Sequence, residues 1–333
     1  MRDIKYDLIR CIAIVFVICI HSMGAMNEAL LKEDVTFSLK LIGLCFNSII
    51  YTGVPLFTLL SGSLLLGKTE TLKIFFKKRL KRIFIPFLLW SFFVFLIKYM
   101  EQYQTIDITH FILTFTNQFF SNGTHGIYWY VYLIIGLYLI TPILRVIFVN
   151  ANKEQIYYFG GILIVFTLAS KICPNLTVFY RFSSLNLEYI TYFILGYIIS
   201  HYLIKEIPKG NFVKIAYIGM ILSIGGYLIE QFFFFNSNIP WFFFTSIFLF
   251  SAILSSECES KSNRIHKAIS FISFTSYGIY LSHFLFISLF IKLEISTFLP
   301  IYIQPIIITL IVLISNLLFM LLIQKIKLEK YLM

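Results

Sequence analysis

The chain has few charged residues for its length. Only 13% of its 333 residues are Asp, Glu, Lys or Arg, whereas 59% are hydrophobic and 19% are aromatic. Soluble globular domains carry about 25% charged residues, so this composition excludes that class and indicates a polytopic membrane protein. The net charge of +11 would suggest a nucleic-acid partner in a soluble protein. The positions of the charges along the chain show whether that interpretation applies here.

Most of the 27 Lys and Arg residues fall in segments that would share one side of a membrane, including seven between Lys68 and Arg82. By the positive-inside rule, this bias predicts that the N-terminus is cytoplasmic. The basic residues are then explained by membrane orientation and by contact with membrane lipids. We therefore predict no nucleic-acid partner.

Cysteine is scarce and follows no pattern. Three of the five cysteines, Cys11, Cys19 and Cys45, lie within apolar segments. An odd and scattered count supports neither a disulfide framework nor a metal site, so we interpret them as small core residues and predict no metal. The chain also lacks a glycine-rich phosphate loop and a convincing Ser-His-Asp order.

Apolar runs of about 17 to 25 residues, the length of a transmembrane helix, recur along the whole sequence. They predict an all-α fold, a single domain over residues 1–333 with about ten transmembrane helices. An even number would return the C-terminus to the cytoplasm, in agreement with Lys325, Lys327 and Lys330. The expected spans are 8–26, 40–66, 83–100, 128–148, 156–172, 185–203, 213–235, 241–256, 268–291 and 303–324.

The first span carries two ionisable residues, Arg10 and His21. At about 100° per residue, both side chains leave one face of a helix, roughly 16 Å apart along its axis. Ionisable groups in a membrane helix face a protein interior by default and mark a site. A cleavable signal peptide is the alternative, but the apolar run is longer than a signal core, so we expect an uncleaved span.

The second span contains Gly53-Val54-Pro55 near its middle. Proline removes a backbone donor and glycine permits close approach, so this triplet predicts a kink or break. One interpretation is a tilted helix around a packing kink. The other is a helix break that lines a cavity.

The segment from Lys68 to Arg82 alternates basic and apolar residues at helical spacing, which is typical of an amphipathic helix at the cytoplasmic surface. It could be an anchor on anionic lipids. It could also bind the phosphates of an anionic cosubstrate, because clustered Arg and Lys are the usual phosphate partners. The sequence leaves both interpretations open.

Two later spans contribute further candidates. Span nine contains Tyr280 and His283, and His283 lies at about the same outer-half depth as His21. Two histidines at one depth are consistent with a shared polar cavity. Span four opens on an aromatic cluster that includes Trp129, which is either an interfacial belt or a surface for sugar stacking.

These residues would suit a protein that meets a phosphate-rich molecule from the cytoplasm. Roughly 16 Å is about the reach of an extended pantetheine arm, so phosphates near Arg10 would bring a thioester to His21. Histidine can act as a general base on an acceptor hydroxyl or can take the acyl group itself.

The sequence resembles the acyltransferase-3 family of membrane acyltransferases over nearly its whole length. The matching segments, in order, are Tyr6-Asp7-Leu8-Ile9-Arg10 with His21, Val54-Pro55-Leu56-Phe57 with Ser61-Gly62, Arg82-Ile83-Phe84-Ile85-Pro86, Tyr128-Trp129-Tyr130, and Tyr277-Gly278-Ile279-Tyr280-Leu281-Ser282-His283. Any one segment alone would be weak evidence for the family, but all of them in this order are specific evidence for it.

The resemblance implies ten spans in a bacterial cytoplasmic membrane and transfer of an acyl group, usually acetyl from acetyl-CoA, to a cell-surface glycan or lipid-linked oligosaccharide. It implies that Arg10 and His21 are essential, with Arg10, Arg79, Lys81 and Arg82 as candidate donor-binding residues. Ser61, Trp129, Tyr280 and His283 become candidate cavity-lining residues. The closest type is the stand-alone surface-polysaccharide O-acetyltransferase, which delivers the acyl group without an appended domain.

The chain departs from the family pattern at two places. Relatives often have Arg-x-Arg after the second span, where this chain has Arg79-Leu80-Lys81 and so loses one bidentate fork. Many relatives also have a histidine where Ile127 stands here, and His125 is displaced by two positions, so we assign it no role. The main alternative function is a polysaccharide exporter or flippase, with the Gly53–Pro55 break and the two histidines along its path.

Overall fold

The computed structural model describes residues 3–32, 35–103, 107–121, 123–172, 187–233, 239–256, 263–294 and 299–332. Over these residues the secondary structure is helical, without strands. Arg2, Arg181 and Lys261, three of the charges used to orient the chain, lie outside the described residues. The helices are α1 (Ile4–Ser22), α2 (Gly24–Leu30), α3 (Phe37–Ile50), α4 (Gly53–Leu65), α5 (Leu72–Arg79), α6 (Ile85–Tyr103), α7 (Ile108–Ser121), α8 (Trp129–Asn150), α9 (Lys153–Ile172), α11 (Leu187–Ile198), α12 (Ile204–Glu206), α13 (Lys209–Phe233), α14 (Trp241–Ser255), α15 (Asn263–Lys292), α16 (Gln304–Lys325) and α17 (Glu329–Leu332).

The helices confirm the predicted all-α membrane fold. In the described part of the chain, eight helical stretches are long and apolar enough to cross a membrane, and the bent pair of α1 and α2 makes a ninth. The remaining expected span, 241–256, corresponds to α14, which has 15 residues. At 1.5 Å per residue this helix is about 22 Å long, shorter than the roughly 30 Å hydrocarbon layer. The cytoplasmic placement of the termini stays a prediction.

Two helices break near the centre of the bundle. The first span bends by 59° between α1 and α2, immediately after His21. The second breaks at Tyr51 and Thr52, between α3 and α4, next to the Gly-Val-Pro triplet that predicted it. A Cβ atom on Gly53 would lie 3.0 Å from Cβ of Phe16 and 3.1 Å from the backbone oxygen of Ala13, so glycine here lets α4 begin tightly against α1.

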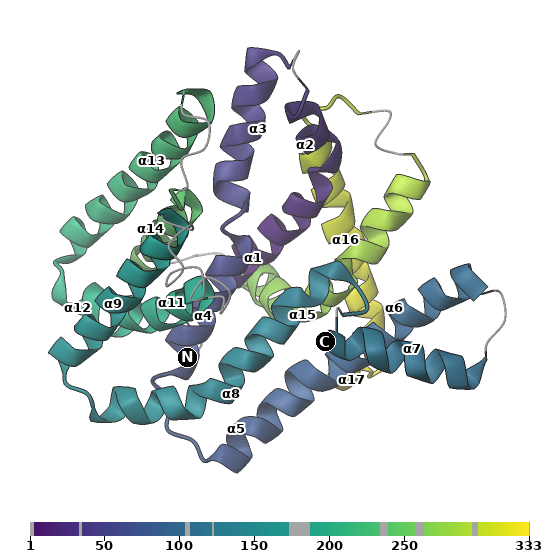
Figure 1. The fold of residues 1–333 in the computed structure, drawn as a ribbon, viewed down its shortest axis with the longest axis horizontal. Helices are drawn as coiled ribbons and strands as arrows, with labels where there is room; N and C mark the ends of the chain where they lie inside the picture. The colour runs from purple at the N-terminus through teal and green to yellow at the C-terminus, as the bar shows by residue number, and fades with distance from the viewer. Residues whose placement is uncertain are drawn as a thin grey trace.

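The helix predicted within 68–82 is present as α5, Leu72–Arg79. Helix α5 continues through a π-helical turn, Leu80–Phe84, directly into α6, and Figure 1 shows the two as one continuous run. A π turn releases a backbone carbonyl from the regular helical ladder. The hydroxyl of Tyr277 on α15 donates to the carbonyl of Ile83 at 2.9 Å, so tertiary packing satisfies the turn.

Helix α1 lies in the middle of the bundle, between α4, α15 and α16 (Figure 1). Helices α9 and α13 lie toward one edge of this view, and α6 and α7 toward the other. Helices α4 and α11 cross with their backbones in contact, because Gly62 faces Phe193 and Gly196 faces Leu59. Small residues permit this approach in membrane proteins, where van der Waals packing rather than hydrophobic burial holds helices together.

Candidate active site

The structure brings together the two histidines that the sequence puts at similar depth. His21 lies in the last turn of α1 and His283 lies on α15, and their ring centroids are 5.3 Å apart. The helices run in the same direction, since Arg10 contacts Ser273 while His21 contacts His283. One helix, α15, therefore contacts both Arg10 and His21.

His283 is fully buried, and its hydrogen bonds define its tautomer. Its Nδ1 lies 2.7 Å from the carbonyl oxygen of Tyr280 and 3.2 Å from that of Ile279. Carbonyl oxygens only accept, so Nδ1 carries the proton and the neutral ring keeps Nε2 as an acceptor. Nε2 is buried and has no hydrogen-bond partner in the structure. A buried acceptor beside the His21 ring is what a site needs to hold an imidazole N–H.

His21 opens into a cavity of about 210 Å³. The cavity lies at the two helix breaks, and its walls include His21, Tyr51, Pro55, Trp129, Tyr189 and Tyr280. Of the predicted lining residues, Trp129 and Tyr280 reach the cavity, while His283 lies buried behind His21. Ser61 lies deeper on α4, where its hydroxyl interacts with Tyr130.

The cavity wall is held in place by reciprocal hydrogen bonds between α15 and the start of α8. The Tyr128 hydroxyl donates to the Leu281 carbonyl at 3.0 Å, and the Tyr280 hydroxyl donates to the Ile127 carbonyl. Each tyrosine thus fixes the backbone beside the other. The two bonds join the aromatic motifs of α8 and α15, although 153 residues separate the partners of each bond.

A third histidine lies at the same place. The His125 ring stacks on Phe284 with centroids 4.1 Å apart, and it interacts electrostatically with His21 and His283. Burial and the nearby Lys98 charge lower the pKa of His125 from 6.5 to about 4, so it is neutral at pH 7. Sequence reasoning gave this residue no role, because its displacement from the family pattern hid its position.

At the opposite end of α1, Arg10 is held by a buried carboxylate. Asp7 is only 2% exposed and contacts Arg10 at 3.1 Å. The Ser273 hydroxyl donates to Asp7 at 2.7 Å and the Ser270 hydroxyl lies 3.5 Å from it. Asp7 lies three residues before Arg10 on one helix, a spacing that lets the two side chains pair. The Arg10 side chain remains 26% exposed, so it can still meet a ligand.

The candidate donor-binding residues divide into two groups. Arg79 points inward, with its guanidinium carbon 4.6 Å from the Phe75 ring and 5.6 Å from the Tyr138 ring. The Tyr138 hydroxyl is within electrostatic range of both Arg79 and Arg10, which brings these two arginines to one region. Lys81 and Arg82 are exposed and lie in the π turn.

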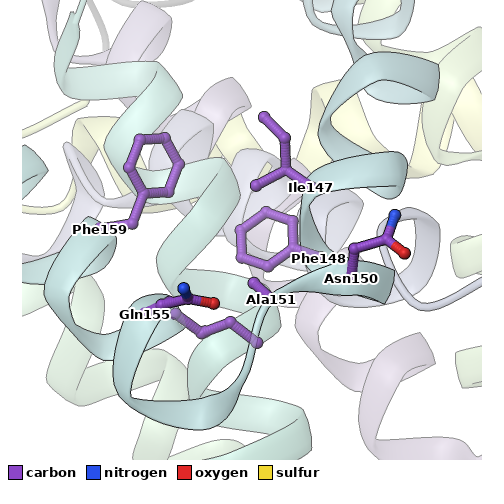
Figure 2. Close-up of a pocket in the computed structure, with 7 residues that line it drawn as sticks. Ile147, Phe148, Asn150, Ala151, Gln155 and Phe159 are labelled. Atoms are coloured by element: carbon purple, nitrogen blue, oxygen red, sulfur yellow. The ribbon is translucent and has the colours of Figure 1, made fainter.

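A second, larger pocket lies away from the histidines. Its volume is about 380 Å³, and Figure 2 shows it at the turn between α8 and α9, between Phe148 and Phe159. It contains none of the predicted site residues. Among the residues that the structure describes, there is also no cluster of three His, Cys, Asp or Glu that could hold a metal.

The order and spacing of these elements match one family model. Residues 3–325 match the model of the acyltransferase domain, which covers α1 through α16. The chain belongs to the acyltransferase-3 family. No curated protein and no solved structure matches it. The chain is therefore a membrane acyltransferase, and two of its candidate site residues, Arg10 and His21, lie on α1.

Proposed function

We propose that this acyltransferase moves an acetyl group from cytoplasmic acetyl-CoA to a hydroxyl of a glycan at the outer face of a bacterial cytoplasmic membrane. The observation that carries the proposal is the His21 ring, which lines a cavity and lies 5.3 Å from the ring of His283, whose buried Nε2 has no hydrogen-bond partner in the structure. This arrangement suits a base whose orientation is fixed by a second residue.

In the proposed reaction, Arg10 and Arg79 hold the phosphates of CoA at the cytoplasmic end, and the exposed Lys81 and Arg82 add positive charge at the mouth of the site. The thioester reaches His21 along α1, roughly 16 Å away. His283 accepts a hydrogen bond from one nitrogen of His21. The other nitrogen is then free to take a proton from the glycan hydroxyl.

The chemistry balances without a further reactant. The glycan oxygen attacks the thioester carbonyl as His21 removes its proton, a C–O bond forms and the C–S bond breaks. The thiolate of CoA leaves and takes the proton from His21. In the second route, a ring nitrogen of His21 attacks the thioester carbonyl, a C–N bond forms, the C–S bond breaks, and the thiolate of CoA leaves with the ring N–H proton. The glycan oxygen then attacks the acyl group, a C–O bond forms, the C–N bond breaks, and the hydroxyl proton passes to the ring nitrogen of His21. Rapid acid quenching followed by mass spectrometry of the peptide that contains His21 separates the two routes.

The aromatic wall of the cavity supports a carbohydrate acceptor. The Trp129 side chain is 46% exposed and its ring lies 5.4 Å from that of Tyr189. Exposed aromatic rings bury the apolar faces of ligands at little entropic cost, because they have few rotatable bonds. A sugar stacked on Trp129 would present its hydroxyl groups toward His21.

The test is acetyl transfer from labelled acetyl-CoA to glycan in membranes that contain the full chain. His21→Ala should abolish transfer, and the matched control His266→Ala, on the cytoplasmic end of α15, should retain it. Full activity in His21→Ala would refute the assigned role. The exporter alternative predicts a different result: deletion would stop export of the polymer while acetylation of the retained polymer continued. Membership in an acyltransferase family favours transfer.

A further inference from the structure

The loop between α4 and α5 contains a carboxylate that three cations share. Glu70 is 9% exposed, and its Oε1 contacts both Arg145 at 3.2 Å and Arg79 at 3.6 Å. Its other oxygen, Oε2, contacts Lys78 at 2.7 Å. Both guanidinium groups also lie over the ring of the buried Phe75, at 4.6 and 4.7 Å. Two arginines are therefore held together on one carboxylate oxygen and one aromatic ring.

This cluster has more positive charge than Glu70 can neutralise. Lys68 is a fourth cation there, and burial together with the nearby Arg79 charge lowers its pKa. Burial alone would raise the pKa of Glu70, but hydrogen bonds from Lys78 and Arg145 hold it below its usual range, so Glu70 is ionised. One negative charge then faces four positive charges. Lys68 and Lys78 are exposed, whereas the side chains of Arg79 and Arg145 are only 16% and 9% exposed. The buried part of the cluster therefore has two positive charges for one negative charge, and an uncompensated buried charge is unfavourable unless another anion is bound.

The cations and the carboxylate lie on different kinds of backbone. The cations Lys78, Arg79 and Arg145 project from helices α5 and α8, whereas Glu70 lies in the non-helical segment between α4 and α5. Arg145 is anchored further, because its Nε donates to the Leu65 carbonyl at 2.8 Å. The carboxylate can therefore leave without unfolding a helix, and the three cations would stay in place around the vacated position.

We propose that Lys78, Arg79 and Arg145 form a phosphate-binding site, and that Glu70 occupies it as an internal anion that a phosphate group of the acyl donor displaces. This inference rests on the proposed function and adds Arg145, Lys78 and Glu70 to the donor site. A phosphate monoester carries about −1.5 to −2 charges at pH 7 and three acceptor oxygens. It would neutralise the cluster better than one carboxylate, and two arginines with a lysine suit its geometry. The site opens to solvent beside Lys78, whose side chain is 54% exposed.

The sign of the effect of Glu70→Gln separates this proposal from a purely structural ion pair. Glutamine keeps the shape of the side chain but removes the competing charge, so coenzyme A should bind about threefold to tenfold more tightly to this variant. If Glu70 only orients the cations, the same substitution would weaken binding. We would measure binding of free coenzyme A by calorimetry on the full chain, in nanodiscs of zwitterionic lipid.

Two further variants keep the test informative if Glu70→Gln is poorly folded. Lys78→Gln removes an exposed cation and should weaken binding of coenzyme A by about threefold to tenfold. Lys77→Gln is the matched control, since Lys77 is the neighbouring exposed residue of α5 and is not one of the three cations proposed to bind phosphate. Its affinity should stay within twofold of the parent protein. Equal losses in Lys78→Gln and Lys77→Gln would show a diffuse electrostatic effect and would overturn the proposal.

The source of the phosphate is tested in two parallel arms. One arm compares coenzyme A with its form that lacks the 3′-phosphate. The other arm measures phosphatidylglycerol retained by the purified protein, using native mass spectrometry. Tighter binding in Glu70→Gln for the lipid alone would assign the site to a membrane headgroup and would refute the donor assignment. Binding of coenzyme A that no variant changes would refute this inference while acetyl transfer stands. If neither the parent protein nor any variant, His21→Ala included, binds coenzyme A, both this inference and the proposed function are refuted.

Discussion

The crossing of α4 and α11 leads to a quantitative prediction for Gly62. A Cβ atom at this position would lie 1.6 Å from the carbonyl oxygen of Phe193, whereas nonbonded carbon and oxygen atoms approach to roughly 3.3 Å. The two helices would have to separate by about 1.5 Å or more. Because the obstacle is backbone, no side-chain rotation can relieve the overlap. The separation would also move α4, which begins at Gly53 and contributes Val54 and Pro55 to the cavity wall.

Overpacking of a well-packed interior destabilises proteins by about 1 to 3 kcal/mol, and occasionally by more. We expect Gly62→Ala to reach the upper end, about 3 kcal/mol. The thermal midpoint of the purified protein should then fall by on the order of 5 °C or more. It is measured in detergent by size-exclusion chromatography after heating. Gly161→Ala on α9 is the control, because a Cβ atom there would meet no atom within 4 Å.

The double variant adds a second criterion. Gly196 faces Leu59 across the same crossing, so helices already separated by Gly62→Ala should accept Gly196→Ala at a smaller further loss. Neighbouring substitutions of this kind are not additive. If Gly62→Ala melts at the same temperature as Gly161→Ala, or if the double variant shows the full sum of two large losses, then the reasoning from close backbone approach is wrong.

Three further predictions concern charge and hydrogen bonding. Asp7→Asn should destabilise the protein by about 1 to 3 kcal/mol, less than for a fully buried pair because Arg10 is 26% exposed. It should also raise the acetyl-CoA concentration needed for transfer, and unchanged values of both would refute the pairing. Tyr277→Phe should cost about 1 to 2 kcal/mol, because the Ile83 carbonyl loses its donor; a melt equal to the parent would contradict this. Since His125 has a pKa of about 4 instead of 6.5, its contribution to stability is complete above about pH 6.5 and is lost as the pH falls toward 4. Thermal midpoints across this range should therefore fall less steeply in His125→Asn, and parallel curves would refute the assignment.

The local patterns of the sequence predicted the helices well. Long apolar runs can only be helices in a bilayer, because each backbone donor and acceptor must be satisfied within the segment. The same argument predicted the break at Gly53-Val54-Pro55, since proline and glycine act on the backbone of their own helix. The helix predicted after Lys68 is present as α5. Its continuation into α6 was not predicted, because the π turn that joins the two helices is stabilised by Tyr277 of a distant helix.

For the candidate site, the sequence by itself determined the register of Arg10 and His21, because one helix carries both and helical geometry is local. It also picked out Trp129, Tyr280 and His283 through motifs. Only the tertiary structure decided which groups face them: the carbonyls that fix the His283 tautomer, the placement of His125, and the convergence of Arg145 on Glu70. These contacts join segments tens to hundreds of residues apart, and the periodicity of a single helix contains no information on its partner across the bundle.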